Sequence, residues 1–483
     1  MSKKFRVRCA PSPSGTLHVG NAKTFLFNYL FSRKYDADFV LRIEDTDTAR
    51  VVDQGAEKIL SELNWLGLTP TMGWGTDNCP AGAYTQMERL PTYKKYAEQL
   101  LEQGDAYRCY CTEEELTKAR DEAMAKNPKH PFKYPGTCRD IKERLDKPFV
   151  IRFKAPTEGT TDYEDVAFGK RSVPNKENYD FVILRHSEIP LFNFANCIDD
   201  LVIDNITHVI RGSDHLKNTP QQVMIADALK LERPIYCHLP MLLNAAGGKL
   251  SKRDGSVSVA EFREMGFTPH AILNYLVRFG WSHKDQEIFS LDQMIDLFAI
   301  EDCGKNDGKF DMKKFTSVQY EHLKSEALTS TDEYEKMLLP FLKKKGLVED
   351  AFTSAKLRAA MPLVRARAHT LVEAADEMMP FVIDTIENPD FKDVSMKVRE
   401  KVSTLITALD SDPAWGEDHL RQLTKNWLVE NDLSLKELGG FMRLSLTGRS
   451  HSPELFQVMA TLGRRSSIKR LEIGASRLTG LDK

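Results

Sequence analysis

The feature that most constrains this chain is the stretch APSPSGTLHVGNAK near its N-terminus, where two prolines and two glycines precede a helix-like segment. The alternating run FRVRCA before it predicts a strand. The spacing of Phe25, Tyr29 and Leu30 after it predicts a helix. Pro11 and Pro13 hold the connecting loop extended, because each proline ring fixes its own φ. We therefore expect a tight corner between a strand and a helix.

Such a corner presents backbone N–H groups at the helix start to anions, above all to phosphate. Gly15 and Gly20 let the backbone approach a ligand closely, and His18, just before the helix, can donate to a phosphate oxygen. The alternative is a tight turn in which His18 only caps the helix. The glycine spacing fits neither the fingerprint GxGxxG nor the P-loop.

The run DFVLRIED follows this helix and completes a strand–helix–strand unit, which predicts an α/β fold with a parallel sheet. Proline, glycine and charged stretches then interrupt the pattern before apolar runs resume. Helical periodicity dominates the last third of the chain. We divide the chain into the first half of a sheet domain, an inserted domain, the second half of the sheet domain and two helical regions, which cover residues 1–78, 79–189, 190–255, 256–325 and 326–483.

Composition excludes several classes of protein. The 483 residues carry 67 basic and 70 acidic side chains, a net charge of -3, so any nucleic-acid binding must come from local patches. No apolar run of membrane-spanning length occurs, and the N-terminus has no apolar core of a signal peptide, so we expect no membrane association. Eight scattered cysteines argue against a disulfide scaffold and favour a cytoplasmic protein.

A second loop, GGKLSKRDG, has a composition suited to phosphate. Gly247 and Gly248 precede Lys249, Ser251 and Lys252. Lysines supply point charges to phosphate oxygens, and glycines give the loop freedom to close over a polyphosphate. A solvated basic loop is the alternative interpretation.

Together the two loops carry a resemblance. LHVG resembles the HIGH motif and KLSKR the KMSKS motif of class I aminoacyl-tRNA synthetases, in the same order. The blocks RCAPSPSGTLHVGNAKTFLFNYLF, FVLRIEDTD, THVIRGSDHLKNTPQQ and LTGRSHSPELFQVMATLGR are similar to bacterial-type glutamyl-tRNA synthetase over nearly the whole chain.

This resemblance implies a Rossmann-like parallel-sheet catalytic domain with an inserted acceptor-binding domain, a stem-contact helical domain and an all-α anticodon-binding region. It implies ATP-dependent ligation of L-glutamate to tRNA(Glu) through a glutamyl-adenylate, which releases pyrophosphate and AMP. The substrate carboxylate is the nucleophile, so the enzyme supplies positioning and electrostatic stabilisation, with Mg²⁺ accompanying ATP. The family is usually monomeric, and whether tRNA(Gln) is also charged stays open.

The resemblance also assigns roles at matching positions. The catalytic residues are His18, Lys249 and Lys252. The ATP-binding residues are Ser14, His18, Gly20, Asp214, Lys249, Ser251 and Lys252. The glutamate-binding residues are Arg8, Ala10, Ser12, Glu44, Phe192, Asn196 and Arg211. Among these, the two arginines match the γ-carboxylate and Glu44 matches the amino group. An acidic helix start is the alternative for Glu44.

Two positions depart from the family pattern. Phe192 stands where relatives commonly carry a tyrosine hydroxyl facing glutamate, which removes one polar contact worth about 1 kcal/mol. Ser213 replaces an acidic residue in GSDH, close to the nucleotide. Two rival functions therefore remain: another nucleotidyl transferase of the same fold, and a catalytically silent tRNA-binding relative.

The inserted segment contains a candidate metal site. Cys109 and Cys111 lie one residue apart, and Cys138 follows on a glycine-containing turn, so three thiolates can form three corners of a tetrahedral zinc site. The resemblance adds Tyr134 as a fourth ligand in related enzymes, and Asp140 stands where other members carry a histidine. The fourth ligand stays open, and three free cysteines are the alternative.

The helical C-terminal third ends in a group of basic residues. The residues alone favour helices packed against one another. The resemblance assigns this region to anticodon reading, which argues against the short paralogue that lacks it and against glutaminyl-tRNA synthetase, whose counterpart is a β-barrel. The basic group comprises Arg443, Arg449, Arg464, Arg465, Lys469 and Arg470.

Overall fold

The computed structural model divides the chain into two compact units, which are described separately. The catalytic unit comprises Met1–Arg263 with Ile272–Met312, and the helical unit comprises Glu264–Ala271 with Lys313–Lys483. The structure describes residues 4–127, 132–250, 258–347, 354–386 and 389–480. In this part of the chain no helix is both long and apolar enough to span a bilayer.

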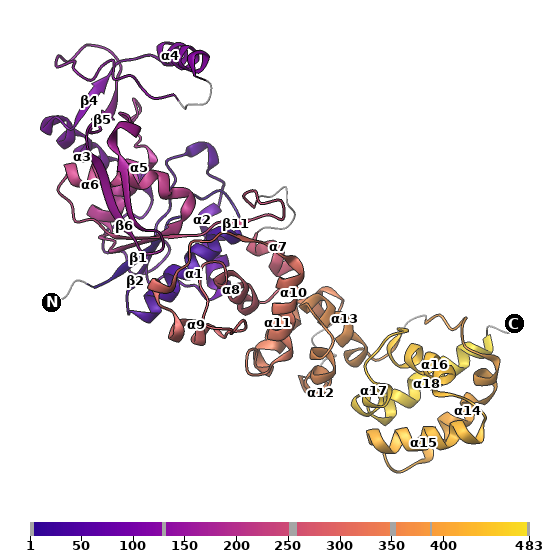
Figure 1. Cartoon of the computed structure of the whole chain (residues 1–483). Helices are drawn as coiled ribbons and strands as arrows, with labels where there is room; N and C mark the ends of the chain where they lie inside the picture. The colour runs from indigo at the N-terminus through magenta and orange to yellow at the C-terminus, as the bar shows by residue number, and fades with distance from the viewer. Residues whose placement is uncertain (1–3, 128–131, 251–257, 348–353, 387–388, 481–483) are drawn as a thin grey trace. The chain divides into compact units, whose positions relative to one another are not determined.

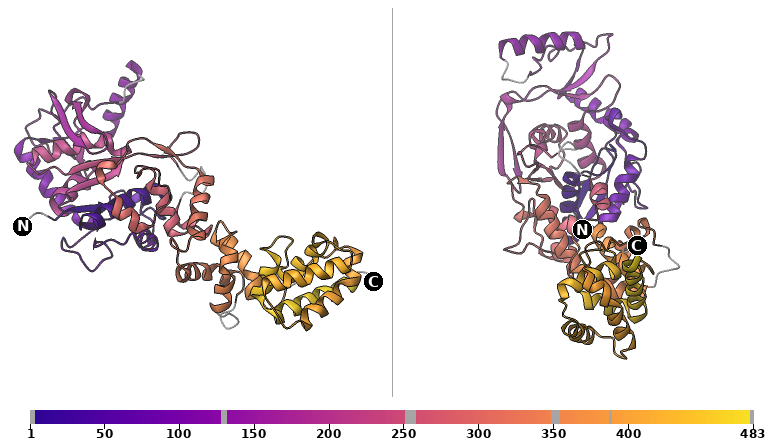
Figure 2. Two further views of the ribbon diagram at one scale, coloured as in Figure 1. Left: turned by 60° about the horizontal axis from the view of Figure 1, so that its bottom comes forward. Right: turned by 90° about the vertical axis from the view of Figure 1, so that its right-hand side faces the viewer.

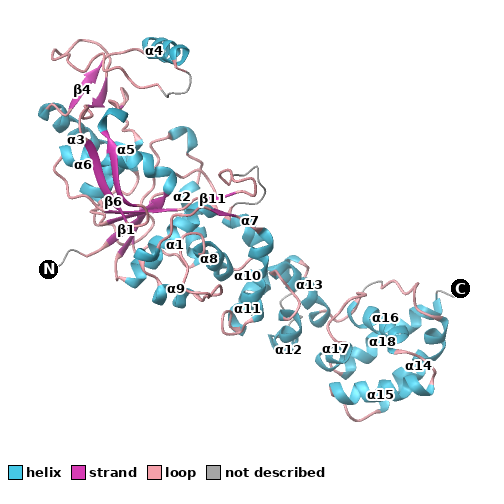
Figure 3. Cartoon of the chain, viewed as in Figure 1, coloured by secondary structure: helices cyan, strands magenta, loops and turns pink. Residues whose placement is uncertain are grey.

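Parallel strands form the centre of the catalytic unit (Figure 3). One sheet has the order β1-β2-β3, with all pairs parallel, and comprises β1 (Arg6–Cys9), β2 (Asp38–Leu41) and β3 (Met72–Gly73). The second has the order β7-β6-β10-β9 and comprises β6 (Thr160–Asp165), β7 (Gly169–Pro174), β9 (His208–Gly212) and β10 (Ile235–Leu239). The N–H of Thr207 donates to the carbonyl of Arg6 at 3.0 Å and joins the two sheets at β1 and β9.

Apolar helices connect these strands. Helix α1 (Val19–Lys34) links β1 to β2, and α6 (Thr219–Ala228) links β9 to β10 (Figure 1). Most of α1 is buried, including Phe27, Leu30 and Phe31, so the helix lacks a polar face. The remaining elements of this unit are α2 (Gly55–Leu66), α5 (Phe192–Ile198), β11 (Leu242–Leu243), α7 (Val259–Glu264), α8 (Pro269–Val277), α9 (Leu291–Leu297) and β12 (Gly308–Lys309).

The segment predicted as an insertion builds a separate antiparallel sheet and also joins the parallel one. It contains α3 (Leu90–Gln103), β4 (Ala106–Cys109), α4 (Glu113–Lys126), β5 (Val150–Phe153) and β8 (Val182–Leu184), with β4, β5 and β8 paired. Helix α4, which has no buried residue, lies far from the parallel strands in both turned views (Figure 2). The hairpin β6–β7 extends the parallel sheet of the catalytic unit, because β6 pairs with β10. The sequence did not anticipate that the insertion completes the catalytic sheet.

The helical unit packs its helices around one apolar core that includes Leu338, Met378, Phe441 and Leu471. Ser330 and Ser434 begin helices as capping boxes, each with a glutamate three residues later. The helices are α10 (Met312–Lys324), α11 (Thr331–Lys344), α12 (Ser354–Arg365), α13 (Leu371–Val382), α14 (Met396–Ser411), α15 (Glu417–Glu430), α16 (Leu435–Thr447), α17 (Leu455–Leu462) and α18 (Arg464–Gly480). The predicted α/β sheet domain and helical C-terminal region are both confirmed.

Candidate active site

A cavity of about 720 Å³ opens at the carboxyl ends of the parallel strands. Ligands bind at this edge of open α/β sheets, because the loops that follow the strands converge there. Its walls include the predicted residues Arg8, Ala10, Ser12, His18, Gly20, Glu44, Phe192, Asn196, Arg211, Asp214 and Lys249. Ser14 is exposed and does not line the cavity. Ser251 and Lys252 lie outside the described residues.

The proline-rich corner is held open by backbone hydrogen bonds. The carbonyl of Pro11 accepts from Glu44 N–H at 3.0 Å, and the carbonyl of Pro13 accepts from Val52 N–H at 2.9 Å. A Cβ atom on Gly55 would lie 2.3 Å from the oxygen of Pro13, so only glycine fits there. The loop is therefore extended, as the prolines predict.

His18 caps α1 and fixes its own tautomer. Its Nδ1 accepts from Gly20 N–H at 3.0 Å, which places the proton of the neutral ring on Nε2, the atom that can donate to a phosphate oxygen. The carbonyl of His18 accepts from the N–H groups of Asn21 and Ala22. The expected row of unpaired N–H groups is therefore wrong for these three amides, because the capping residue already uses them. The group at this corner that can donate to a phosphate oxygen is therefore the imidazole of His18.

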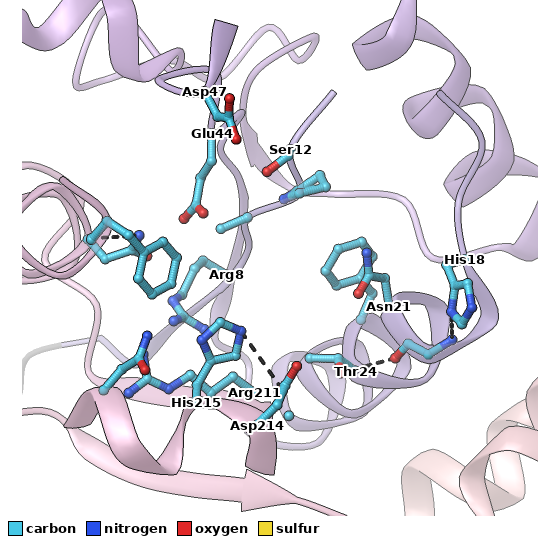
Figure 4. A pocket seen from close by; sticks show the side chains of 18 of the residues that line it. Arg8, Ser12, His18, Asn21, Thr24, Glu44, Asp47, Arg211, Asp214 and His215 are labelled. Carbon is cyan, nitrogen blue, oxygen red and sulfur yellow. Dashed lines mark hydrogen bonds and ion pairs between the residues drawn. The ribbon is translucent and has the colours of Figure 1, made fainter. Parts of the chain in front are cut away.

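Two buried arginines form one end of the cavity (Figure 4). Arg8 donates through Nε to Asp200 at 3.2 Å and through Nη1 to the carbonyl of Ile210 at 3.2 Å. Arg211 donates through Nη2 to Thr219 Oγ1 at 2.8 Å, and its Nη1 is buried with no hydrogen-bond partner among the described residues. Burial and the charge of Arg8 lower the pKa of Arg211 to about 10. An anion that reaches Arg211 would supply the partner that its Nη1 lacks among the described residues.

Glu44 and Asn196 face the arginines from a shared support. Arg42 is fully buried and donates through Nη2 to Glu44 Oε1 at 3.1 Å and to Asn196 Oδ1 at 3.0 Å. Its Nη1 donates to Asp200 at 2.7 Å and to Asp204 at 2.9 Å. Burial raises the pKa of Glu44, although the charge of Arg42 opposes the rise. This end thus presents two arginines for a carboxylate and one carboxylate for an ammonium group.

The aspartates of this network come from a π-helical turn. The turn η4 (Asp199–Ile203) continues α5 and brings Asp199 and Asp200 inward. Arg89 closes the cluster by donating to Asp199 at 2.8 Å and to Asp204 at 2.7 Å. These groups support the site without lining the cavity.

Phe192 and His215 form an aromatic wall. Their rings stack with centroids 5.2 Å apart, and the side chain of Phe192 is 37% exposed. Burial and the charge of Arg211 lower the pKa of His215 to about 4, so the imidazole is neutral near pH 7. Phe192 therefore contributes a stacking surface where a tyrosine would add a hydroxyl.

The other end of the cavity combines the loop of Lys249 with Asp214 of the short 3₁₀ helix η5 (Ser213–Asn218) and Lys23 of α1. Lys249 Nζ contacts Asp214 Oδ2 at 2.9 Å, with side chains 67% and 39% exposed. Asn244 Oδ1 accepts from Gly248 N–H at 2.8 Å and shapes the turn before Lys249. Lys23, which the sequence did not single out, donates to the carbonyl of Pro240, and burial lowers its pKa to about 8. This end offers cations to a polyphosphate.

The three predicted thiols meet in the insertion. The Sγ atoms of Cys109, Cys111 and Cys138 lie within 4.8 Å of one another, and those of Cys111 and Cys138 are 3.6 Å apart. Zinc–sulfur distances of about 2.3 Å place the sulfurs of a tetrahedral site about 3.8 Å apart, so the donor set fits zinc. The hydroxyl of Tyr134 lies 3.4 Å from Cys109 Sγ and 3.5 Å from Cys111 Sγ. Asp140 is not part of this cluster.

Comparison with known proteins agrees with this geometry. Residues 4–317 match the family described as tRNA synthetases class I (E and Q), catalytic domain, and residues 333–475 match the anticodon binding domain family. A glutamate–tRNA ligase from Geobacter sulfurreducens is 39% identical, covering 96% of this chain and 97% of its own. One from Anaeromyxobacter sp. (strain K) is 40% identical, with 97% and 98% covered.

A solved structure is similar over the same length. The crystal structure of a glutamate tRNA ligase from Elizabethkingia meningosepticum, in complex with its amino acid, has a TM-score of 0.85 and 30% identity, covering 99% of this chain and 100% of that chain. The chain therefore belongs to the class I tRNA synthetases for glutamate and glutamine, and within them to the glutamate–tRNA ligases.

Proposed function

We propose that this chain ligates L-glutamate to tRNA(Glu) at the expense of ATP, first forming glutamyl-adenylate and pyrophosphate and then glutamyl-tRNA and AMP. The single observation that carries the proposal is Arg211, which lines the cavity with Arg8 and Glu44 and whose buried Nη1 has no hydrogen-bond partner among the described residues. A dicarboxylic amino acid is the ligand that meets all three groups: its side-chain carboxylate would pair with the arginines and its ammonium group with Glu44.

The reaction needs alignment more than a protein nucleophile. The α-carboxylate of glutamate attacks the α-phosphate of ATP, and pyrophosphate leaves in line. His18 would donate to a phosphate oxygen, while Lys249 and Lys252 would stabilise the charge that develops on the leaving pyrophosphate. Gly20, Ser14 and Ser251 belong to the same ATP-binding assignment. Mg²⁺ would enter on the phosphates of ATP, and Asp214 is a cavity carboxylate of the kind it prefers.

The tRNA roles follow the chain's division. We assign the acceptor end to the insertion (79–189), the stem to residues 256–325 and the anticodon to residues 326–483. The match of residues 333–475 to an anticodon binding domain supports the last assignment. Arg470 is not a reader of bases, because it is buried and donates to the carbonyls of Pro380 and Leu446. A side chain must be exposed to stack on the unpaired bases of an RNA loop or to bond to their edges.

A structural Zn²⁺ held by Cys109, Cys111 and Cys138 is part of the proposal. The position of the Tyr134 hydroxyl favours that residue over Asp140 as the fourth ligand. Zinc analysis of protein purified without chelator should find about one ion per chain. Cys138→Ser should lose it, while Cys79→Ser, at an exposed free cysteine, should keep it. An unmodified protein without zinc would show that the three cysteines are simply free thiols.

We also propose a cytoplasmic monomer. None of the eight cysteines forms a disulfide, as expected in a reducing compartment. Light scattering of the purified protein tests the oligomeric state. Charging assays with purified tRNA(Glu) and tRNA(Gln) decide whether the second tRNA is also a substrate.

The test of the main proposal is glutamate-dependent ATP–pyrophosphate exchange, run with and without total bacterial tRNA. Exchange that requires both glutamate and tRNA, and that glutamine and aspartate do not support, is the expected result. Exchange supported without any tRNA by another acid would favour a different nucleotidyl transferase. Absence of exchange from a protein that still retains tRNA on a filter would identify a silent tRNA-binding relative.

A further inference from the structure

The guanidinium of Arg211 is held by a residue on the neighbouring strand. Arg211 on β9 and His238 on β10 are register partners in a parallel pair, so their side chains project on the same side of the sheet. Nε of Arg211 donates to Nε2 of His238 at 3.1 Å. Both side chains are buried, and His238 has no exposed surface. The hydrogen bond between Arg211 and His238 is therefore buried and shielded from water.

His238 is in turn held by the insertion. Its Nδ1 lies 2.5 Å from Oδ2 of Asp165, the last residue of β6, which pairs with β10. Oδ1 of Asp165 accepts from the N–H groups of Ala167 and Phe168 at 3.1 and 2.9 Å. Although burial opposes it, the hydrogen bond from His238 lowers the pKa of Asp165. Asp165 is thus ionised and oriented by its own turn.

These contacts define one protonation pattern. An ionised Asp165 accepts from Nδ1–H of His238, which leaves a lone pair on Nε2 to accept from Arg211. Burial and the positive charge of Arg211 lower the pKa of His238, so the ring is neutral. With Nε bound to His238 and Nη2 bound to Thr219, the plane of the guanidinium is fixed, and Nη1 has no hydrogen-bond partner in the part of the chain that the structure describes.

We propose that Asp165 and His238 are positioning residues that orient Arg211 toward the side-chain carboxylate of the substrate and thereby set its preference for glutamate. The inference rests on the proposed function. It makes amino-acid recognition depend on the β6–β7 hairpin, which belongs to the predicted insertion, so a segment remote in sequence completes the glutamate end of the cavity.

The test measures glutamate affinity directly by calorimetric titration, without relying on activity. His238→Ala should raise the Kd for glutamate by about 10- to 100-fold, since a hydrogen bond to a charged group is lost. His238→Gln should recover most of this affinity, because its amide oxygen can accept from Nε of Arg211. Cys237→Ala, at the adjacent buried residue of β10, is the matched control and should leave the Kd unchanged.

Two further measurements separate positioning from a general structural effect. Competition by L-glutamine, which lacks the charged carboxylate, should be unchanged by His238→Ala, so the ratio of glutamate affinity to glutamine affinity should fall toward one. In an Arg211→Ala background, His238→Ala should add no further loss, because the two residues act as one unit. Equal losses for both ligands, or additive losses in the double variant, would overturn the inference.

The outcomes also separate this inference from the proposed function. If the unmodified protein does not bind glutamate, the proposed function fails and the inference fails with it. If the unmodified protein binds glutamate and His238→Ala binds it equally well, only the inference is wrong. Asp165→Asn, which preserves shape and removes the charge, should give a smaller loss in the same direction, and thermal unfolding of each variant checks that it is folded.

Discussion

The two ends of the cavity are built in opposite ways. At the proposed glutamate end, Arg8, Arg211 and Asn196 are buried. Arg8 and Asn196 belong to the network of Arg42 and its aspartates, whereas Arg211 donates to His238 and Thr219. At the proposed nucleotide end, Lys249 on a loop pairs with Asp214 of η5, and their side chains are 67% and 39% exposed. Buried ion pairs are rigid and strongly coupled to folding, whereas exposed pairs contribute little to stability. We therefore expect the proposed amino-acid end to be organised before binding, and the proposed nucleotide end to be completed by ATP.

The largest effect is expected from removing the centre of the buried network. Arg42→Ala should lower the free energy of unfolding by about 3 to 5 kcal/mol, because it leaves the carboxylates of Asp199, Asp200 and Asp204 without their shared cation. Denaturant titration measures the change. Lys94→Ala, which removes an exposed ion pair with Glu188, is the control and should change the free energy of unfolding far less. Equal losses in the two variants would break the contrast between buried and exposed ion pairs, on which the comparison of the two ends rests.

At the nucleotide end the loss should appear in rate. Lys252→Ala should lower the rate of glutamate activation by about two to three decades, because one electrostatic donor to the transition state is lost. Single-turnover measurements at saturating ATP and glutamate report this rate. Lys170→Ala, at an exposed lysine of the β6–β7 hairpin, should leave it unchanged. A rate close to that of the unmodified protein would remove Lys252 from the catalytic assignment.

The difference between the ends also explains what the sequence could predict. The strand FRVRCA, the corner after it and the helix from Asn21 onward follow from local spacing, and the structure confirms them. Arg8, Glu44 and Arg211 fall at strand ends, where the motif blocks already placed them. The residues that hold Arg211 could not be predicted from the sequence. Asp165 and His238 are 73 residues apart and meet only through the pairing of β6 with β10.

Charge in the sequence was also a poor guide to exposure. Arg470 belonged to the basic group near the C-terminus, yet it is 3% exposed and holds the ends of α13 and α16 through their carbonyls. Arg464 donates to the carbonyls of Asp410 and Ala414. A long cationic side chain can be used inside a helical bundle to satisfy helix C-termini, which no local pattern reveals.

A pH titration tests the aromatic wall between the two ends. The pKa of His215 is lowered to about 4 in the folded protein and returns to 6.5 on unfolding. Between these values the unfolded chain binds the extra proton, so stability falls as the pH drops from 6.5 toward 4 and is unaffected above that window. His215→Gln should reduce this acid sensitivity. If His215→Gln and the unmodified protein lose the same stability between pH 7 and pH 5, His215 is protonated at pH 5 in the folded protein.

The smallest expected effect concerns Phe192, whose ring stacks on His215 in the cavity wall. Phe192→Tyr keeps the ring and adds one hydroxyl, and a neutral hydrogen bond contributes about 1 kcal/mol. The KM for glutamate should therefore stay the same or fall by up to about fivefold, with the KM for ATP unchanged. Phe192→Leu, which loses the stacking surface, is the contrasting variant and should raise it. Because Arg8, Arg211 and Glu44 are fixed by buried partners, we expect the aromatic wall to make only a small contribution to glutamate affinity. A collapse of activity in Phe192→Tyr would mean that the wall, and not the charged network, determines how glutamate is held.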